Sequence, residues 1–214
     1  MAAPDRAMLE ILGKSTSINV RKVAWLCAEL GLDHQQPGAD GTDPAGTAAA
    51  LAALNPNGQV PVLRDGGFVL WESNSICRYL AAREGRYDLL PQAPQARARV
   101  EQWMDWQATD LNTAWRYAFM AKVRRHPDYA DPTLVAASLA QWNRLMGMLD
   151  RQLAQTGAHV AGTEFSLADI VLGLSTQRWR MTPGDKPTLP AVDAWFERLR
   201  PRAGFALHVD NGVP

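Results

Sequence analysis

The sequence predicts a small α/β domain followed by a domain built from helices alone. Strand and helix patterns alternate up to about residue 86, a short break with two prolines (LLPQAPQ, 89–95) follows, and beyond it apolar residues recur only at helical spacing. Prolines in a polar break are typical of the boundary between two domains. We therefore expect an α/β domain at 1–86, a linker at 87–95 and an all-helical domain at 96–214.

The first domain is expected to begin with a strand and a helix. MLEIL (8–12) is a short apolar run of strand length, and the apolar residues after it are spaced by three and four. Gly31 follows the last of them and is a natural helix stop. We expect this helix to begin near Ser17. Its apolar positions are Val20, Val23, Ala24, Cys27 and Leu30.

The rest of the first domain is expected to hold a helix, a hairpin and another helix. An alanine-rich stretch at about 46–54 indicates the first of these helices. Two short apolar runs, VPVL (60–63) and FVL (68–70), are expected to form strands joined by a turn at Asp65, Gly66 and Gly67. The last helix of the domain is indicated by Ile76, Cys77, Leu80 and Ala81.

The second domain shows helical patterns throughout. One runs over about 95–122 and a second has apolar residues from Val135 to Leu153. In GTEFSLADI (162–170), Ser166 is expected to cap a helix with a reciprocal bond from Asp169, and Phe165 to pack on Ile170. A final helix is expected from about Pro190 until Pro201 ends it. The first pattern carries Val100, Trp103, Trp106 and Trp115.

The composition gives no sign of a nucleic-acid or membrane partner. The 214 residues include 47% hydrophobic residues, and 22 basic residues balance 22 acidic ones, so no net charge attracts either partner. No stretch reaches the roughly 18 apolar residues of a membrane span. The amino-terminal stretch lacks the basic and apolar regions of a secretory signal, so we expect a cytoplasmic protein.

Several familiar chemical motifs are absent from the sequence. LGKS (12–15) follows a strand as a phosphate-binding loop would, but Met8 stands where that loop needs its first glycine. The four histidines share no helical spacing, so we predict no metal site and no histidine base. Cys27 and Cys77 lie on helical patterns without a CxxC pair, and we expect both in the core.

Two features remain unexplained by these motifs. The junction KSTSINVRKV (14–23) places three hydroxyls, Ser15, Thr16 and Ser17, at a helix N-terminus, where unpaired amides and the helix dipole favour an anion. The simpler interpretation of the junction alone is an ordinary N-cap. The second feature is Pro61, which stands inside an apolar strand pattern although it removes a backbone donor.

A family resemblance accounts for both features. NPNGQVPVL (55–63), followed eleven residues after Pro61 by Glu72 in WESNSICRYL, resembles the amino-terminal, thioredoxin-like domain of a cytosolic glutathione transferase. SLAD (166–169) and LPAVDAWFERLRPRAGF (189–205) resemble the helical domain of the same family. The resemblance covers nearly the whole chain. It implies the glutathione transferase fold, with a cis peptide bond before Pro61.

The resemblance also implies how glutathione binds. The amide and carbonyl of Val60 would pair with the cysteinyl backbone of glutathione as a short added strand, with Pro61 shaping the turn. Ser73 would donate to the γ-glutamyl carboxylate at a helix N-terminus, and Glu72 would receive the ammonium. The alternative for this pair is a helix cap with a first-turn acid. Gln59 stands where many relatives have lysine, so weaker binding of the glycyl carboxylate is expected.

The thiol of glutathione needs a partner that stabilises its anion. Members of the family use a tyrosine, serine or cysteine near the first helix, but the first tyrosine here is Tyr79 and Cys27 lies inside a helix. The chain is therefore similar to the serine-type, theta-like and beta-like bacterial members. Ser17 matches the serine of those members and Asn19 a supporting asparagine. Ser15 and Thr16 remain alternatives for the hydroxyl.

The resemblance implies a second substrate between the thiol and the first helix of the bundle. Trp115, Phe119, Met120 and Trp179 are candidates for its apolar wall, and Arg116 for a polar group facing the same cleft. For the aromatic residues a place in the core is an equal alternative. For Arg116 the alternative is a solvated surface position.

The leading functional hypothesis is detoxification by conjugation of the glutathione thiolate to hydrophobic electrophiles. Glutathione-dependent disulfide reduction is an alternative, because a bound thiolate also attacks sulfur. A non-catalytic binder of glutathione or of hydrophobic ligands is another, since fold does not imply activity. We expect no cofactor apart from glutathione as a co-substrate, and the family implies a homodimer.

Overall fold

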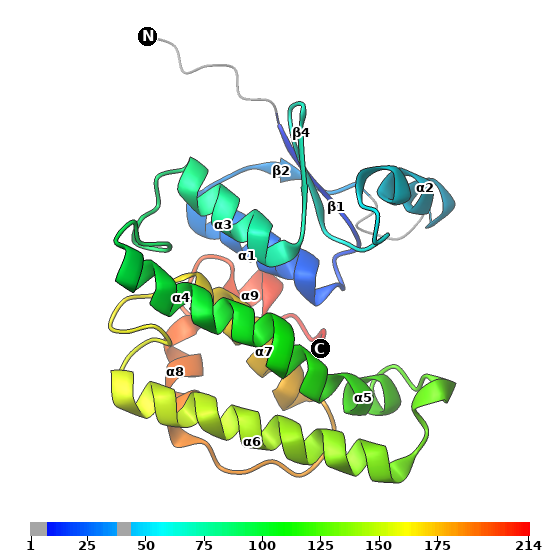
Figure 1. Ribbon diagram of the computed structural model, residues 1–214, viewed down its shortest axis with the longest axis vertical. Helices are drawn as coiled ribbons and strands as arrows, with labels where there is room; N and C mark the ends of the chain where they lie inside the picture. The colour runs from blue at the N-terminus through cyan, green and yellow to red at the C-terminus, as the bar shows by residue number, and fades with distance from the viewer. Residues whose placement is uncertain (1–7, 38–43) are drawn as a thin grey trace. The chain divides into compact units, whose positions relative to one another are not determined.

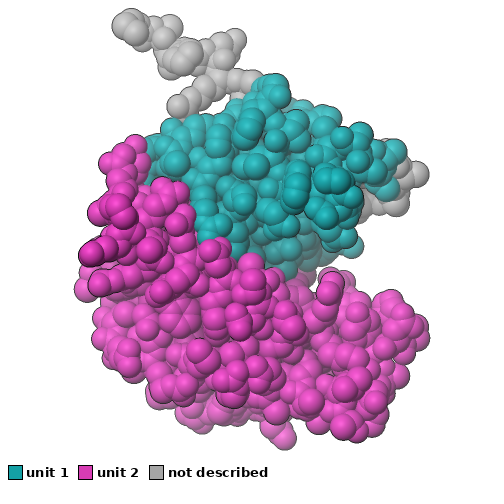
Figure 2. All heavy atoms as spheres, viewed as in Figure 1, with its two compact units in different colours: residues 1–86, 202–211 teal, residues 87–201, 212–214 magenta. Residues whose placement is uncertain are grey.

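A computed structural model describes residues 8–37 and 44–214 and divides into two compact units (Figure 2). The first unit comprises residues 1–86 and 202–211, and the second comprises 87–201 and 212–214. The first seven residues, part of the stretch for which no secretory signal is expected, lie outside the described residues.

The first unit is built on a mixed sheet of four short strands (Figure 1). The strand order is β2-β1-β3-β4; β1 and β2 are parallel, and the other pairs are antiparallel. The two expected strands around Asp65 form a hairpin, as predicted. The short second strand has no clear apolar pattern and was not predicted. The strands are β1 (Leu9–Leu12), β2 (His34–Gln35), β3 (Val62–Asp65) and β4 (Phe68–Trp71).

Helices cover both faces of this sheet. In Figure 1, α1 and α3 lie together on one side of the strands and α2 lies on the other. Leu51 of α2 packs in one cluster with Leu12 and Val62 of the sheet, while the next residues along the strands, Ile11 and Leu63, are fully buried as well. The helices are α1 (Ile18–Leu30), α2 (Pro44–Leu54), α3 (Ser73–Arg83) and α9 (Phe205–His208).

Residues 202–211 cluster with the first unit, although we expected them in the helical domain. The physical reason is a set of contacts with α1. Arg202 donates to the Glu29 carboxylate at 2.5 Å, and Phe205 packs edge-on against Trp25 with ring centroids 5.9 Å apart. Gly204 lies so close to Trp25 that an added Cβ would meet the ring at 2.3 Å.

The second unit consists of helices. The segment expected as one helix over about 95–122 is interrupted by a π-helical turn, η1, that separates α4 from α5. A widened turn of this kind is frequent at functional sites. The described elements are α4 (Pro94–Trp106), η1 (Gln107–Leu111), α5 (Asn112–Lys122), η2 (Pro127–Tyr129), α6 (Pro132–Thr156), α7 (Leu167–Met181) and α8 (Pro190–Leu199).

The segment expected as a linker is packed into the second unit. Leu89 and Leu90 are each only 1% exposed, and the carbonyl of Leu89 accepts a hydrogen bond from the amide of Leu167 at 3.0 Å. The polar and proline-rich composition therefore marks the end of the first unit, but the residues themselves are part of the second.

A buried carboxylate organises the start of α7. The capping box predicted for Ser166 and Asp169 is present, with the Asp169 side chain accepting from the amide of Ser166 at 2.9 Å. The same carboxylate, which is fully buried, also accepts from the amide of Val160 and from the indole of Trp195. The cap thus joins α7, α8 and the preceding loop.

The cysteines lie in the core, as expected. Cys27 on α1 and Cys77 on α3 are both fully buried and free. Burial raises the pKa of each thiol to about 12, so neither is poised to act as a nucleophile.

Candidate active site

The sheet register brings three chain segments to one place. Leu12 at the end of β1 and Trp71 at the end of β4 both pair with Val62, the first residue of β3. These three residues form a row across the ends of the strands. The residues next to the row along the chain are therefore neighbours at the same edge of the sheet. These are the junction that leads into α1, the loop that ends at Pro61, and Glu72 at the start of α3.

The loop before β3 offers an unpaired backbone. The Val60–Pro61 peptide bond is cis, as the resemblance implies. Neither the amide nor the carbonyl of Val60 is hydrogen-bonded to any residue that the structure describes. Asn55, 2% exposed, fixes the loop by donating to the carbonyl of Gln59 at 2.8 Å, and the Gln59 side chain is exposed.

The N-terminus of α1 presents the predicted hydroxyl. Ser17 is the N-cap residue, but its side chain makes no bond to the helix amides, and no acidic residue occupies the first turn. Ser17 and Asn19 are half-buried, whereas Ser15 and Thr16 are exposed. An uncapped helix start with a nearby hydroxyl is suited to an anion.

Gly13 allows this helix start to approach the Val60 loop. A Cβ at Gly13 would lie 2.7 Å from the Cγ2 atom of Val20 and 2.8 Å from the Cβ atom of Val60. Its φ of 136° also disfavours any other residue. Only glycine lets the first turn of α1 come this close to the proposed glutathione strand.

The N-terminus of α3 is also uncapped. Glu72 is the N-cap residue with φ 73°, an uncommon conformation for a residue with a side chain, and that side chain makes no cap bond. Ser73 follows at the first helical position and is 6% exposed. Backbone strain of this kind clusters at ligand sites, so the outlier supports a binding role for the exposed Glu72.

The candidates on the second unit occupy different environments. Phe119 is 3% exposed, and the guanidinium of Arg178 lies 4.2 Å above its ring centre. Trp115 is half-buried and stacks edge-on against Phe119, while Trp179 is 5% exposed. Arg116 is exposed. Their contact with a substrate stays a prediction.

The family models decide the identity of the fold. The model of the glutathione S-transferase N-terminal domain matches residues 16–83, and that of the C-terminal domain matches residues 111–203. Together they span most of the chain. This chain belongs to the glutathione S-transferase family.

Named glutathione S-transferases are similar over nearly the whole length. The GstB glutathione S-transferase of Escherichia coli K12 is 35% identical over 202 residues, which cover 91% of this chain and 94% of that protein. A theta-class transferase of Xanthomonas axonopodis pv. citri, solved with glutathione bound, is 38% identical with a TM-score of 0.84 over 96% of this chain and 99% of that one. The glutathione S-transferase fold predicted from the sequence is thereby confirmed.

Two residues that the sequence analysis did not single out help to shape the candidate site. Gly13 and Asn55 were not among the predicted site residues, yet one permits the approach of α1 and the other fixes the loop of Gln59. The Asn-Pro-Asn-Gly spacing could have indicated the turn that Asn55 makes with Asn57. The close approach at Gly13 has no sequence signal.

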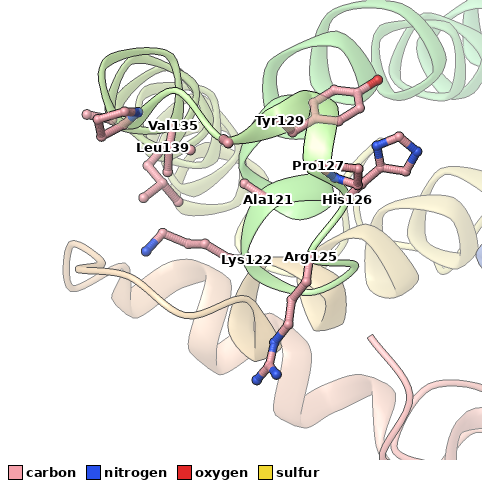
Figure 3. Close-up of a pocket in the computed structure, with 11 residues that line it drawn as sticks. Ala121, Lys122, Arg125, His126, Pro127, Tyr129, Val135 and Leu139 are labelled. Atoms are coloured by element: carbon pink, nitrogen blue, oxygen red, sulfur yellow. The ribbon is translucent and has the colours of Figure 1, made fainter.

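This transferase also has a pocket on the second unit, at the end of α5 (Figure 3). It has a volume of about 600 Å³ and is lined by apolar residues of α6 and by Lys122 and Arg125. None of the predicted site residues lines it. Among the residues 8–37 and 44–214, no cluster of metal-ligating side chains occurs, and no helix is long and apolar enough to cross a bilayer.

Proposed function

We propose that this chain conjugates the thiolate of glutathione to hydrophobic electrophiles. The observation that carries the proposal is the row Leu12, Val62 and Trp71, which brings the start of α1, the free backbone of Val60 and the start of α3 to one edge of the sheet. An extended tripeptide with an anion at each end and a thiol in the middle fits this arrangement.

Glutathione would lie along the edge of the first unit. Its cysteinyl backbone pairs with the free amide and carbonyl of Val60, beside Pro61. Its γ-glutamyl carboxylate accepts from the first-turn amide and hydroxyl of Ser73, and its ammonium contacts Glu72. Gln59 donates to the glycyl carboxylate without an ion pair.

The N-terminus of α1 would stabilise the thiolate. A free thiol with a pKa of about 8.5 is only about 3% ionised at pH 7, and lowering that pKa by two units needs roughly 2.7 kcal/mol. The uncommitted hydroxyl of Ser17 and the dipole of α1 can together supply this. Asn19, which is half-buried in the first turn of α1, would assist.

The proposal also covers the residues that contact the electrophile and the oligomeric state of the protein. Trp115 and Phe119 supply apolar surface for the electrophile, and Arg116 a charge. We further propose a cytoplasmic homodimer that needs no cofactor beyond glutathione as co-substrate. Light scattering tests the dimer.

Two activity assays on wild type and Ser17→Ala test the function. An aryl halide measures conjugation, and a mixed disulfide measures reduction. The proposal predicts conjugation by wild type that falls at least tenfold in Ser17→Ala, with retention on immobilised glutathione kept. Reduction without conjugation would favour the disulfide reductase, and retention without either activity would favour a binder. Ser15→Ala and Thr16→Ala are matched controls, because they remove neighbouring hydroxyls.

A further inference from the structure

The pocket at the end of α5 has the size of a small-molecule site (Figure 3). Its volume of about 600 Å³ falls within the range of about 300 to 1,000 Å³ that is typical of ligand pockets. Its lining residues lie between Ala121 and Leu139, in α5, α6 and the segment between them, so the pocket belongs to the second unit alone. They include none of the residues that we assign to glutathione or to the electrophile.

One wall of the pocket is apolar. Val135, Ala136 and Leu139 line it from α6, and Val135 and Leu139 are neighbours on the helix surface because they are four residues apart. Both side chains are half-buried, which leaves part of their surface open to the pocket. Pro132 at the start of α6 and Ala121 on α5 extend the same surface. This wall fits the hydrocarbon body of a ligand.

Two cations stand at the rim of this wall. Lys122 in the last turn of α5 and Arg125 just after it line the pocket, and both are exposed. Within residues 8–37 and 44–214, neither side chain forms a hydrogen bond or an ion pair. No carboxylate is among the described residues that line the pocket. In Figure 3, Lys122 extends on the same side of α5 as Leu139, which makes Lys122 the cation nearer to the apolar wall.

A further lysine adds to the positive charge. Burial lowers the pKa of Lys186 in the loop after α7, Asp185 opposes this shift, and the charge of Lys122 lowers the pKa further. The same loop meets the pocket wall at Gly184, where an added Cβ would lie 3.1 Å from the Cδ1 atom of Leu139. An anion in the pocket would relieve the repulsion between the two lysines.

The backbone at Arg125 has a conformation that usually belongs to glycine. Its φ is 51°, and the amide of the next residue, His126, donates to the carbonyl of Met120 at 3.0 Å. A glycine would adopt this φ without the steric cost of a Cβ atom. The arginine therefore costs stability while it places a cation at the pocket, and strained positions of this kind cluster at ligand sites.

We propose that this pocket binds an amphipathic organic anion, with a carboxylate or sulfonate head group on an alkyl or aryl body. The head group accepts from Lys122 and, more weakly, from Arg125. The body covers Val135, Ala136 and Leu139. Such a ligand matches both surfaces of the pocket, and its binding requires neither glutathione nor Ser17.

Calorimetric titration with decanoate tests the site, with S-hexylglutathione present to fill the proposed substrate sites. Decylammonium is the matched control ligand, because it has the same chain and a positive head group. We expect saturable binding of decanoate and about tenfold weaker binding of decylammonium, since like charges repel. Absence of saturable decanoate binding, or equal affinity for the two ligands, overturns the proposal.

Two variants of the apolar wall connect the binding to this pocket. Ala136→Glu places a carboxylate on the wall, whereas Ala137→Glu adds the same charge at the next exposed position of α6, which does not line the pocket. We expect the affinity for decanoate to fall about tenfold in Ala136→Glu and to change less than about twofold in Ala137→Glu. Equal affinity in these two variants places the ligand elsewhere and refutes the assignment.

Two variants of the rim test the cations. Lys122→Gln should weaken decanoate binding about fivefold, as for loss of an exposed charge pair. Arg125→Gly should weaken it about threefold without lowering the melting temperature, because glycine suits a φ of 51°. Wild-type affinity in the double variant would show that these cations do not hold the ligand and would overturn the proposal.

Discussion

Replacement of Asp169 by alanine should destabilise the protein more than other single acidic substitutions at helix starts. The carboxylate is fully buried and accepts four hydrogen bonds of 2.8 to 3.0 Å. The donors are the amides of Val160 and Ser166, the hydroxyl of Ser166 and the indole of Trp195. Asp169→Ala leaves all four without their acceptor in the interior.

The expected loss follows from the number of donors. Each buried donor left unsatisfied costs about 1 kcal/mol or more, so four of them give a loss of about 4 kcal/mol. Urea denaturation followed by tryptophan fluorescence measures it, because Trp195 itself is one of the donors. The midpoint should move down by about 1.5 M urea.

A matched control is Asp193→Ala at the start of α8. Asp193 also lies in the first turn of a helix and accepts from Arg180 at 2.7 Å, but its side chain is 50% exposed. An exposed ion pair contributes about 1 kcal/mol or less. If Asp169→Ala and Asp193→Ala lost similar stability, the buried cap would not hold α7 and α8 together and this reasoning would be wrong.

Three further predictions concern strain, thiols and pH. Glu72→Gly removes a side chain from a backbone with φ 73°, so calorimetry should find the melting temperature unchanged or raised. The same variant should bind glutathione about tenfold more weakly, because the partner of the ammonium is lost. A large drop in melting temperature would contradict this. Because burial raises the pKa of Cys27 and Cys77 to about 12, iodoacetamide at pH 8 should label neither thiol in the folded protein and both in denaturant, as mass spectrometry can check. The pKa of His208 falls from 6.5 to about 4 on folding, so between those values the unfolded state binds the extra proton and stability declines as pH falls. His208→Gln should lose less stability than wild type as the pH falls over that range. An identical dependence of the unfolding free energy on pH in both proteins would show that His208 does not cause the loss.

The local sequence patterns were sufficient for most helices and for the hairpin. Gly31 ends α1 in a left-handed conformation, and the Ser166 and Asp169 pair forms the capping box because both signals act within a few residues. β3 and β4 follow from two apolar runs around a glycine turn. Such elements are fixed by short-range chemistry and can be predicted.

The parts that the sequence did not predict depend on contacts between distant residues. The C-terminal segment joins the first unit through pairs such as Glu29 with Arg202, which are 173 residues apart. The π-helical turn inside the expected helix follows no spacing rule, and Gln107 there bonds Asn112 across the widened turn. No local pattern encodes either feature.

The candidate site was predicted only with the help of the family resemblance. The residues alone left two interpretations of the helix start near Ser17, an ordinary N-cap or an anion site, and they left the proline at position 61 unexplained. The sheet register explains why these two features are neighbours, since Val62 pairs with the ends of two other strands. A cavity at Arg21 could not be foreseen either, because three of its eight lining residues come from the segment near the C-terminus.

The most direct test of the central claim is the pKa of the glutathione thiol in the binary complex. Titration of the thiolate absorbance in the ultraviolet gives this pKa for wild type and for Ser17→Ala. The account predicts a value about two units below that of free glutathione in wild type, and a rise of at least one unit in Ser17→Ala. A thiol pKa equal to that of free glutathione in wild type, or the same pKa in both proteins, would contradict it.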